Sequence, residues 1–191
     1  MKKIILASSS IHRKKLLKQL KINFQAISPN IDETRKKNEP INHFVKRLSV
    51  EKAIKIANKS SNAIVIGSDE VAVVGNKILG KPGTIRNARK QLKYISGKDV
   101  VFKTGMCVID TNSMKKLTCI VHYKIKMKKI NNIEINNYIK KEDMLNCAAG
   151  IKVEGLAISL IERTSGCDPT SVIGLPLIKL TEYLRKFNYK V

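Results

Sequence analysis

The sequence predicts an α/β fold, because short apolar segments typical of strands alternate along the chain with amphipathic helical segments. The clearest strand is the unbroken apolar run at residues 63–66, whose β-branched side chains are typical of a strand buried on both faces. The clearest helix spans residues 40–58, where apolar side chains recur at intervals of three and four. With 191 residues, 43% of them hydrophobic, the chain can bury a core, and we expect one domain over residues 1–191, with two lobes.

The segments around these two elements complete the pattern. Residues 3–7 and 23–28 are expected to be strands, and the serines at 8–10 are good N-caps for a helix at residues 11–20. Glycine and asparagine at 75–76 predict a turn. The remaining expected elements are a return strand at 77–79, a helix at 84–95, a hairpin of strands at 100–109 and 116–127, a helix at 132–140, a strand at 156–161 and a helix at 175–186.

Two acids, Asp69 and Glu70, follow the apolar run at residues 63–66, and we expect them where that strand leaves the core. In open α/β sheets, ligands bind in the crevice beyond the carboxyl ends of buried strands. An acid pair there can hold a divalent cation, or one member can accept a proton from water. Because serine, aspartate and glutamate are also common in turns, a plain surface turn stays open. The return strand would bring Lys81 close to the acids.

Three cations occupy positions that suit an anion. Arg13 lies three, four and seven residues before leucines of the helix at 11–20, which places a permanent charge on the inward side of that helix. With Lys14, the serine hydroxyls and the helix N–H groups, it forms an anion cradle, although a solvated basic helix end explains the same residues. Lys52 continues the apolar stripe of the helix at 40–58, so its ammonium either reaches solvent or enters a negatively charged pocket.

The formal net charge of +22 suggests a nucleic-acid partner, because clustered Lys and Arg bind phosphates. However, the lysines are spread over the whole length, and aromatic residues make up only 5%, so stacking platforms for bases are poorly supplied. These features argue against nucleic acid as the partner. A non-catalytic, basic nucleic-acid-binding protein is kept as an alternative.

Cysteine usage and hydropathy bear on the compartment. Cys107, Cys119, Cys147 and Cys167 are widely spaced, without a C-x-x-C pair or a histidine cluster, so neither a zinc site nor a disulfide framework is indicated. We expect reduced thiols in the core. The chain has no run of eighteen apolar residues, and its amino-terminal apolar patch is too short for a secretory signal. We therefore expect a cytoplasmic protein with no membrane partner.

Seven short motifs, taken in order, resemble the Maf family, and they cover nearly the whole chain. They are LASSSIHRKKLL at 6–17, DE at 32–33, EKA at 51–53, GSDEV at 67–71, GKP at 80–82, TG at 104–105 and VIGLPL at 172–177. Maf proteins are cytoplasmic nucleoside triphosphate pyrophosphatases that were first described as septum-formation inhibitors. The resemblance implies a mixed central sheet flanked by helices, like that of inosine triphosphate pyrophosphatase, with two lobes around a central cleft.

Three segments are similar to those that mark the family branch acting on 7-methyl-GTP, namely 146–149, 153–155 and 166–177. The K-A-G-x-Y-x-I-Q-G segment of the dTTP and UTP branch is absent. The resemblance therefore implies hydrolysis of 7-methyl-GTP to 7-methyl-GMP and pyrophosphate. A dTTP or UTP pyrophosphatase and a division-regulating protein without catalysis are the alternatives.

The resemblance also assigns roles to individual residues. Asp69 matches the proton acceptor of the family. Glu33, by itself an ordinary loop acid beside Asp32, matches the acid expected near a divalent metal ion, Mg²⁺ or Mn²⁺. Asp69 would be a second ligand of the same metal ion. The positions associated with base specificity are His12, Glu70 and Glu154. The positions expected at the triphosphate are Ser8, Arg13, Lys14, Lys52 and Lys81. The implied partner is a nucleoside triphosphate, and the oligomeric state is left open, with a homodimer among the alternatives.

Four residues depart from the family pattern. Ile11 replaces a proline, His12 a tryptophan of this branch, Glu70 a glutamine and Lys128 an arginine. The loss of tryptophan weakens the stacking surface for a base. These departures bear on the base preference and leave the phosphate chemistry in place. A degenerate enzyme that keeps the fold without turnover is a further alternative, because the composition has drifted toward Lys, Ile and Asn.

Overall fold

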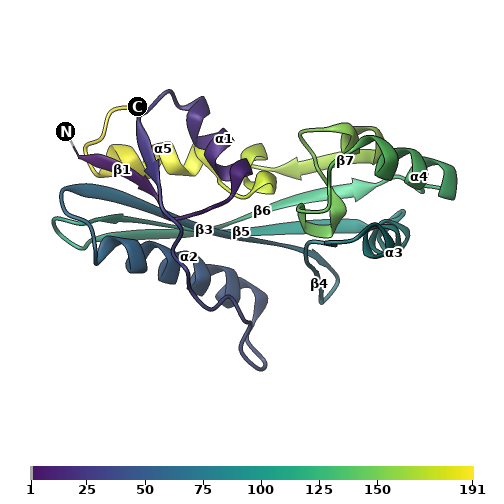
Figure 1. Ribbon diagram of the computed structural model, residues 1–191, viewed down its shortest axis with the longest axis horizontal. Coiled ribbons are helices and arrows are strands. Elements are labelled where there is room, and N and C mark those ends of the chain that lie inside the picture. Colours follow the sequence, from purple (N-terminus) through teal and green to yellow (C-terminus); the bar gives the residue numbers. More distant parts are fainter. Residues whose placement is uncertain (1) are drawn as a thin grey trace. The chain divides into compact units, whose positions relative to one another are not determined.

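The structure, a computed structural model, describes residues 2–191, and the chain forms two compact units. The first unit comprises residues 2–70, 104–121 and 168–191, and the second comprises residues 71–103 and 122–167. The segments are followed by colour and label in Figure 1. That the two units make up a single domain stays a prediction.

The strands described within residues 2–191 form a seven-stranded mixed sheet, which confirms the predicted α/β class. Its order is β2-β1-β3-β5-β6-β7, with β4 paired to β3. β1 is parallel to β2 and β3, whereas β4 is antiparallel to β3 and β7 is antiparallel to β6. The strands are β1 (Lys3–Leu6), β2 (Phe24–Ala26), β3 (Ala63–Val74), β4 (Lys77–Leu79), β5 (Asp99–Asp110), β6 (Lys116–Met127) and β7 (Ile161–Gly166).

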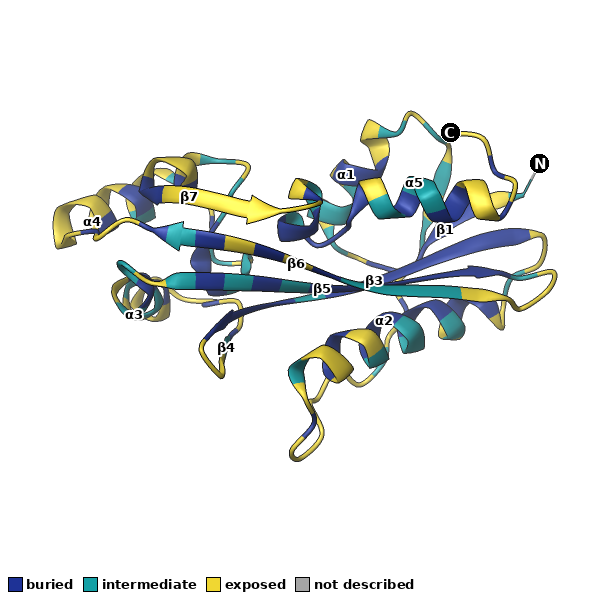
Figure 2. Cartoon of the chain, turned by 180° about the vertical axis from the view of Figure 1, so that it is seen from behind, coloured by how far each residue is buried: buried dark blue, intermediate teal, exposed yellow. Residues whose placement is uncertain are grey.

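In the first unit, helices cover both faces of the strands, as Figure 1 shows. Side chains alternate along β1, so that Ile4 and Leu6 pack in one cluster with α1 (Ile11–Gln19) and α5 (Leu177–Lys186). Ile5 and Ala7 pack in another cluster with the apolar residues of α2 (Ile41–Ala57). Because both faces are covered, β1 after Lys3 and the start of β3 are apolar and lie buried in Figure 2.

In the second unit, α3 (Ile85–Ile95) packs against α4 (Asn132–Lys141) and against the 3₁₀ turn η1 (Ala148–Gly150). Both helix starts are capped by polar side chains. The Thr84 hydroxyl accepts a hydrogen bond from the Asn87 N–H, and Asn131 forms a capping box with Glu134.

The central strand is longer than predicted, and this corrects the expected place of the two acids. β3 continues from residue 63 through Gly67, Asp69 and Glu70 to Val74, so the acids lie within the strand and not beyond its end. The strand was expected to cover the apolar run at 63–66, which is followed by glycine, a residue that commonly breaks regular structure. Here it serves close packing, since a Cβ on Gly67 would overlap the Ser49 carbonyl oxygen of α2.

The strand predicted at residues 156–161 is wrong. Residues Leu156–Leu160 form a 3₁₀ helix, η2, which buries Ala157 and Leu160, three residues apart, and β7 begins only at Ile161. β7 is exposed at every position after Ile161, so it has no apolar alternation that sequence patterning could detect. The remaining predicted elements are confirmed within a few residues, including the hairpin of β5 and β6.

The cysteines differ in exposure, although the prediction placed all four in the core. Cys107 is buried, Cys119 and Cys147 are half-buried, and Cys167 is exposed; all four are free thiols. Cys167 directly follows β7, which is exposed after Ile161, and directly precedes the buried Asp168. Within residues 2–191, no helix combines the length and apolar composition needed to cross a bilayer.

Candidate active site

Two glycines let α2 lie directly on the backbone of the sheet. A Cβ on Gly67 would overlap the backbone of Ser49 and Ala53, and a Cβ on Gly105 would overlap the Val45 carbonyl. Their missing side chains therefore set how closely the helix approaches β3 and β5. This approach brings Lys52, on the sheet-facing side of α2, to Asp69 on β3.

Lys52 is the buried cation of the site and joins two acids. Its Nζ donates to Asp69 Oδ1 at 2.7 Å and lies 2.8 Å from Glu33 Oε1. Lys52 is 4% exposed and Asp69 is 7% exposed. Of the two alternatives left open for Lys52, the structure shows the one in which the ammonium is directed at negative charge and not at solvent. An ammonium buried this deeply needs such partners, because an unpaired buried charge is strongly destabilising.

Arg13 lies beside the backbone of Gly174. Its Nε donates to the Gly174 carbonyl at 2.8 Å, and the buried Ser68 Oγ lies 2.8 Å from the same oxygen. Gly174 has a positive φ of 101°, and a Cβ there would lie 3.1 Å from Arg13 Nε and 3.2 Å from Glu70 Oε2. A larger residue would be strained by this φ, and its Cβ would crowd both charged groups. Glu70, a predicted specificity residue, thus borders Arg13, a predicted phosphate ligand.

The turn that carries Gly174 is held by Asp168, which is 1% exposed. Asp168 Oδ1 accepts from Thr170 N–H at 3.1 Å, and Oδ2 accepts from Ile178 N–H, at the start of α5, at 2.8 Å. A carboxylate at a helix start is also favoured by the helix dipole. Asp168 therefore fixes the segment between β7 and α5, on which Arg13 depends for its carbonyl partner.

The serine run behaves as a helix start, as predicted. The buried Ser8 Oγ accepts from the Ser10 N–H at 3.1 Å, and Ser10 caps α1 by accepting from the Arg13 N–H at 3.4 Å. His12 and Lys14 follow in the first turn of α1 and are half-buried. The run thus places Arg13 and Lys14 at the amino-terminal end of a helix, where anions are favoured.

The first unit therefore contains most of the predicted site residues, while Lys81 and Glu154 belong to the second unit. Both are exposed. Glu154 lies in a segment held by Glu142, whose carboxylate accepts from Lys152 Nζ at 2.7 Å and from the Leu156 N–H at 2.7 Å. The predicted closeness of Lys81 to the acids stays a prediction.

Glu33 and Asp69 are the acids that could hold a metal ion. Within residues 2–191, no group of three His, Cys, Asp or Glu side chains is placed to do so. The two carboxylates instead share the Lys52 ammonium. Such a pair suits Mg²⁺, which commonly takes one or two carboxylates and completes its shell with substrate phosphates and water.

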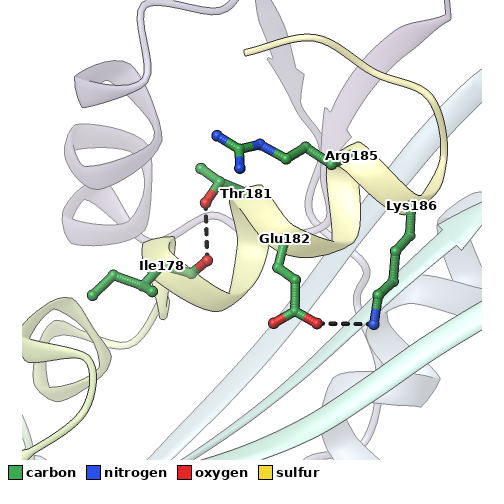
Figure 3. A pocket seen from close by; sticks show the side chains of 5 residues that line it. All are labelled: Ile178, Thr181, Glu182, Arg185 and Lys186. Atoms are coloured by element: carbon green, nitrogen blue, oxygen red, sulfur yellow. Dashed lines mark hydrogen bonds and ion pairs between the residues drawn. The ribbon is translucent and has the colours of Figure 1, made fainter.

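Two surface hollows lie in the first unit and contribute little to this site. One, of about 540 Å³, is lined only by residues of α5, among them Ile178, Glu182 and Arg185 (Figure 3). The other, of about 560 Å³, lies between α1 and β2 and includes Lys14. Neither hollow is lined by Lys52 or Asp69.

Comparison with known proteins decides the family. Residues 3–187 match the model of the family described as Maf-like protein. The chain belongs to the Maf family. A 7-methyl-GTP pyrophosphatase of Pseudoalteromonas translucida is 45% identical over 188 residues, which cover 98% of this chain and 93% of that protein. A protein of the same name from Colwellia psychrerythraea is 41% identical, over 100% of this Maf chain and 96% of its own length. Another, from Nitrosococcus oceani, is 42% identical, over 98% of this chain and 94% of its own length.

Several residues that build the site were given no role from sequence. Gly67, Gly105 and Gly174 lie in motifs noted for the family resemblance, but their close packing is visible only in three dimensions. Asp168 likewise lay in a noted segment, and the Asp-Pro-Thr string typical of a capped turn was the available signal.

Proposed function

We propose that this Maf-family chain is a nucleoside triphosphate pyrophosphatase that hydrolyses 7-methyl-GTP to 7-methyl-GMP and pyrophosphate. Full-length similarity of 41–45% to proteins named for that activity supports the substrate. The observation that carries the chemistry is the buried ion pair of Asp69 and Lys52, bordered by Glu33. A carboxylate that can accept a proton and a cation that can stabilise developing negative charge are groups that phosphoanhydride hydrolysis uses.

In this proposal Asp69 accepts the proton of the attacking water. Lys52 Nζ donates to Oδ1, and we assign the other oxygen, Oδ2, to accept from water. The water oxygen bonds to the α-phosphorus as the bond to the bridging oxygen breaks, and pyrophosphate leaves with that electron pair. Positioned proton transfer of this kind contributes about 10²–10⁴-fold to the rate.

The cations of the first unit would neutralise the triphosphate, which carries about four negative charges. Arg13 is oriented by the Gly174 carbonyl, which engages Nε and leaves the terminal nitrogens Nη1 and Nη2 to bind phosphate. Lys14 lies on the next position of α1, and Lys52 bridges the acids. Lys81 keeps its expected role at the phosphates, and His12, Glu70 and Glu154 keep theirs in base specificity.

A divalent cation, Mg²⁺ or Mn²⁺, belongs to the proposal, with Glu33 and Asp69 as its protein ligands. When bound, it would stabilise charge that develops on the phosphate oxygens. Lys52 would then hold Asp69 ionised and oriented from the protein side. A cytoplasmic location and a homodimeric state also stay predictions.

The proposal is tested by incubating the purified chain with Mg²⁺ and each of 7-methyl-GTP, GTP, dTTP and UTP, and by measuring pyrophosphate release. We expect 7-methyl-GTP to give the highest kcat/KM. Higher turnover of dTTP or UTP would reassign the chain to the sister branch of the family. No release from any nucleotide would leave the fold without this activity and would contradict the proposal.

A further inference from the structure

A buried ion pair closes the loop of residues 27–40, which connects β2 to α2 and carries Glu33. Glu39, at the end of this loop, is 5% exposed. Its two carboxylate oxygens accept from Arg47 of α2, with Nε at 2.7 Å from Oε1 and Nη2 at 2.9 Å from Oε2. Such a two-point contact fixes the relative orientation of both groups, beyond what a single charge contact does.

The same guanidinium reaches the part of the loop next to Glu33. Arg47 Nη2 donates to the Thr34 carbonyl at 3.1 Å, and Nη1 donates to Glu51 Oε2, one turn further along α2, at 3.1 Å. Arg47 therefore attaches the loop to α2 at two points, Thr34 and Glu39. Within the loop, Arg35 Nε donates to the Glu39 carbonyl at 2.8 Å, which closes the turn on itself.

The contact of Glu33 with Lys52 cannot hold the loop by itself. The Glu33 side chain is 58% exposed, and exposed ion pairs contribute little because water screens them. The Arg47 and Glu39 side chains are 11% and 4% exposed. The buried pair is thus the firm attachment, and the position of Glu33 follows from it.

We propose that Arg47 and Glu39 are positioning residues that hold the loop of residues 27–40 on α2, so that Glu33 lies at Lys52 and Asp69. This inference rests on the proposed function. Glu39 faces Arg47, His43 and the Lys36 N–H, and Arg47 faces Glu51 as well. The Arg47 guanidinium holds the pKa of Glu39 well below its usual range, so the pair stays ionised near neutral pH.

The first test measures the loop without using activity. Residues Arg35, Lys36 and Lys37 are consecutive trypsin sites within it. In brief trypsin digestion of the folded protein, we expect R47K to speed cleavage at these sites about tenfold, because Lys cannot reproduce the two-point contact. E39Q should act in the same direction. The control R163K makes the same chemical change in an exposed ion pair with Glu162. It should leave the rate of cleavage at the three loop sites unchanged.

The second test asks whether Arg47 acts through Glu33. We expect R47K to lower kcat/KM for 7-methyl-GTP about tenfold, but less than twofold when it is added to E33Q, since a positioning residue has no effect once its target is removed. Unfolding in urea, measured for every variant, shows which are folded under assay conditions.

These results separate the inference from the proposed function. The positioning role would be overturned if R47K lowered kcat/KM equally with and without E33Q. It would also be overturned if R47K and E39Q left the rate of trypsin cleavage unchanged. Absence of pyrophosphate release by the unmodified chain would overturn the proposed function alone, since faster trypsin cleavage would still show that the pair holds the loop.

Discussion

Nζ of Lys52 lies 2.7 Å from Oδ1 of Asp69, in a contact that joins helix α2 to strand β3. The two residues are seventeen positions apart in sequence, and both side chains are at most 10% exposed. A charged pair this deeply buried is weak evidence for stability as such, because desolvation offsets the attraction. Its presence at the junction of α2 and β3 is better explained by the chemistry we propose for Asp69.

Loss of the Lys52 charge should strongly destabilise the first unit. The K52M change leaves Asp69 buried without its cation, and breaking a buried pair from one side costs about 3–5 kcal/mol. We expect a fall of this size in the free energy of unfolding, measured in urea at pH 7. The matched control is K186M, whose pair with Glu182 is exposed and should contribute less than about 1 kcal/mol. Equal effects of the two changes would mean that the Lys52 pair is not buried in solution.

A methyl group at Gly67 should separate α2 from the sheet. G67A forces the Cβ into the backbone of Ser49 and Ala53, which are not flexible side-chain atoms. Overpacking of this kind costs about 3 kcal/mol, and the shift should also lengthen the contact of Lys52 with Asp69. G80A is the stability control, since a Cβ there meets nothing within 4 Å. The measurement is the free energy of unfolding of both variants. If G67A left this free energy unchanged, α2 would not be in close contact with β3.

Stability should depend on pH through Glu142. Hydrogen bonds from the Leu156 N–H and Lys152 lower the pKa of Glu142 below its ordinary value of 4.5. The unfolded chain therefore binds this proton at a higher pH than the folded chain does. The stabilisation is fully present above about pH 4.5 and is lost as the pH falls through the lower folded pKa.

This dependence is measured by comparing E142Q with the unmodified chain in urea from pH 3 to pH 7. We expect the stability difference between the two to be largest near neutral pH and to shrink as the pH falls below about 4.5. A difference that is constant over the whole range would contradict the lowered pKa.

Thiol labelling should distinguish the cysteines by exposure. Burial raises the pKa of Cys107 to about 12, and Cys167 is exposed at the surface. Because the thiolate is the reactive species, iodoacetamide at pH 8 should modify Cys167 first and Cys107 only after unfolding. Mass spectrometry of the digested protein reports the order. Early modification of Cys107 in the folded protein would contradict its place in the core.

The sequence predicted most elements of the fold because apolar periodicity and helix caps are local signals. α2 and the hairpin of β5 and β6 were predicted within two residues of their observed ends. The failures have physical causes. The length of β3 was missed because Gly67 packs closely against α2, a role that sequence does not distinguish from chain breaking. β7 was missed because a mostly exposed strand carries no apolar alternation.

The candidate site divides in the same way. The inward position of Lys52 followed from helical spacing, and Asp69 and Glu33 followed from motif order, so their meeting could be anticipated. The role of the Gly174 carbonyl as the partner of Arg13 could not be anticipated, because Gly174 lies 161 positions away from Arg13 in sequence. Contacts of that kind depend on tertiary packing, which a single sequence does not display.

The most direct measurement is pyrophosphate release from 7-methyl-GTP by D69N, with D143N as a control that makes the same change at an exposed acid. We expect D69N, still folded in urea titration, to lose about 10²–10⁴-fold in kcat and D143N to stay close to the unmodified chain. A folded D69N that keeps its turnover would contradict the role given to Asp69 and, with it, the proposed chemistry of the site.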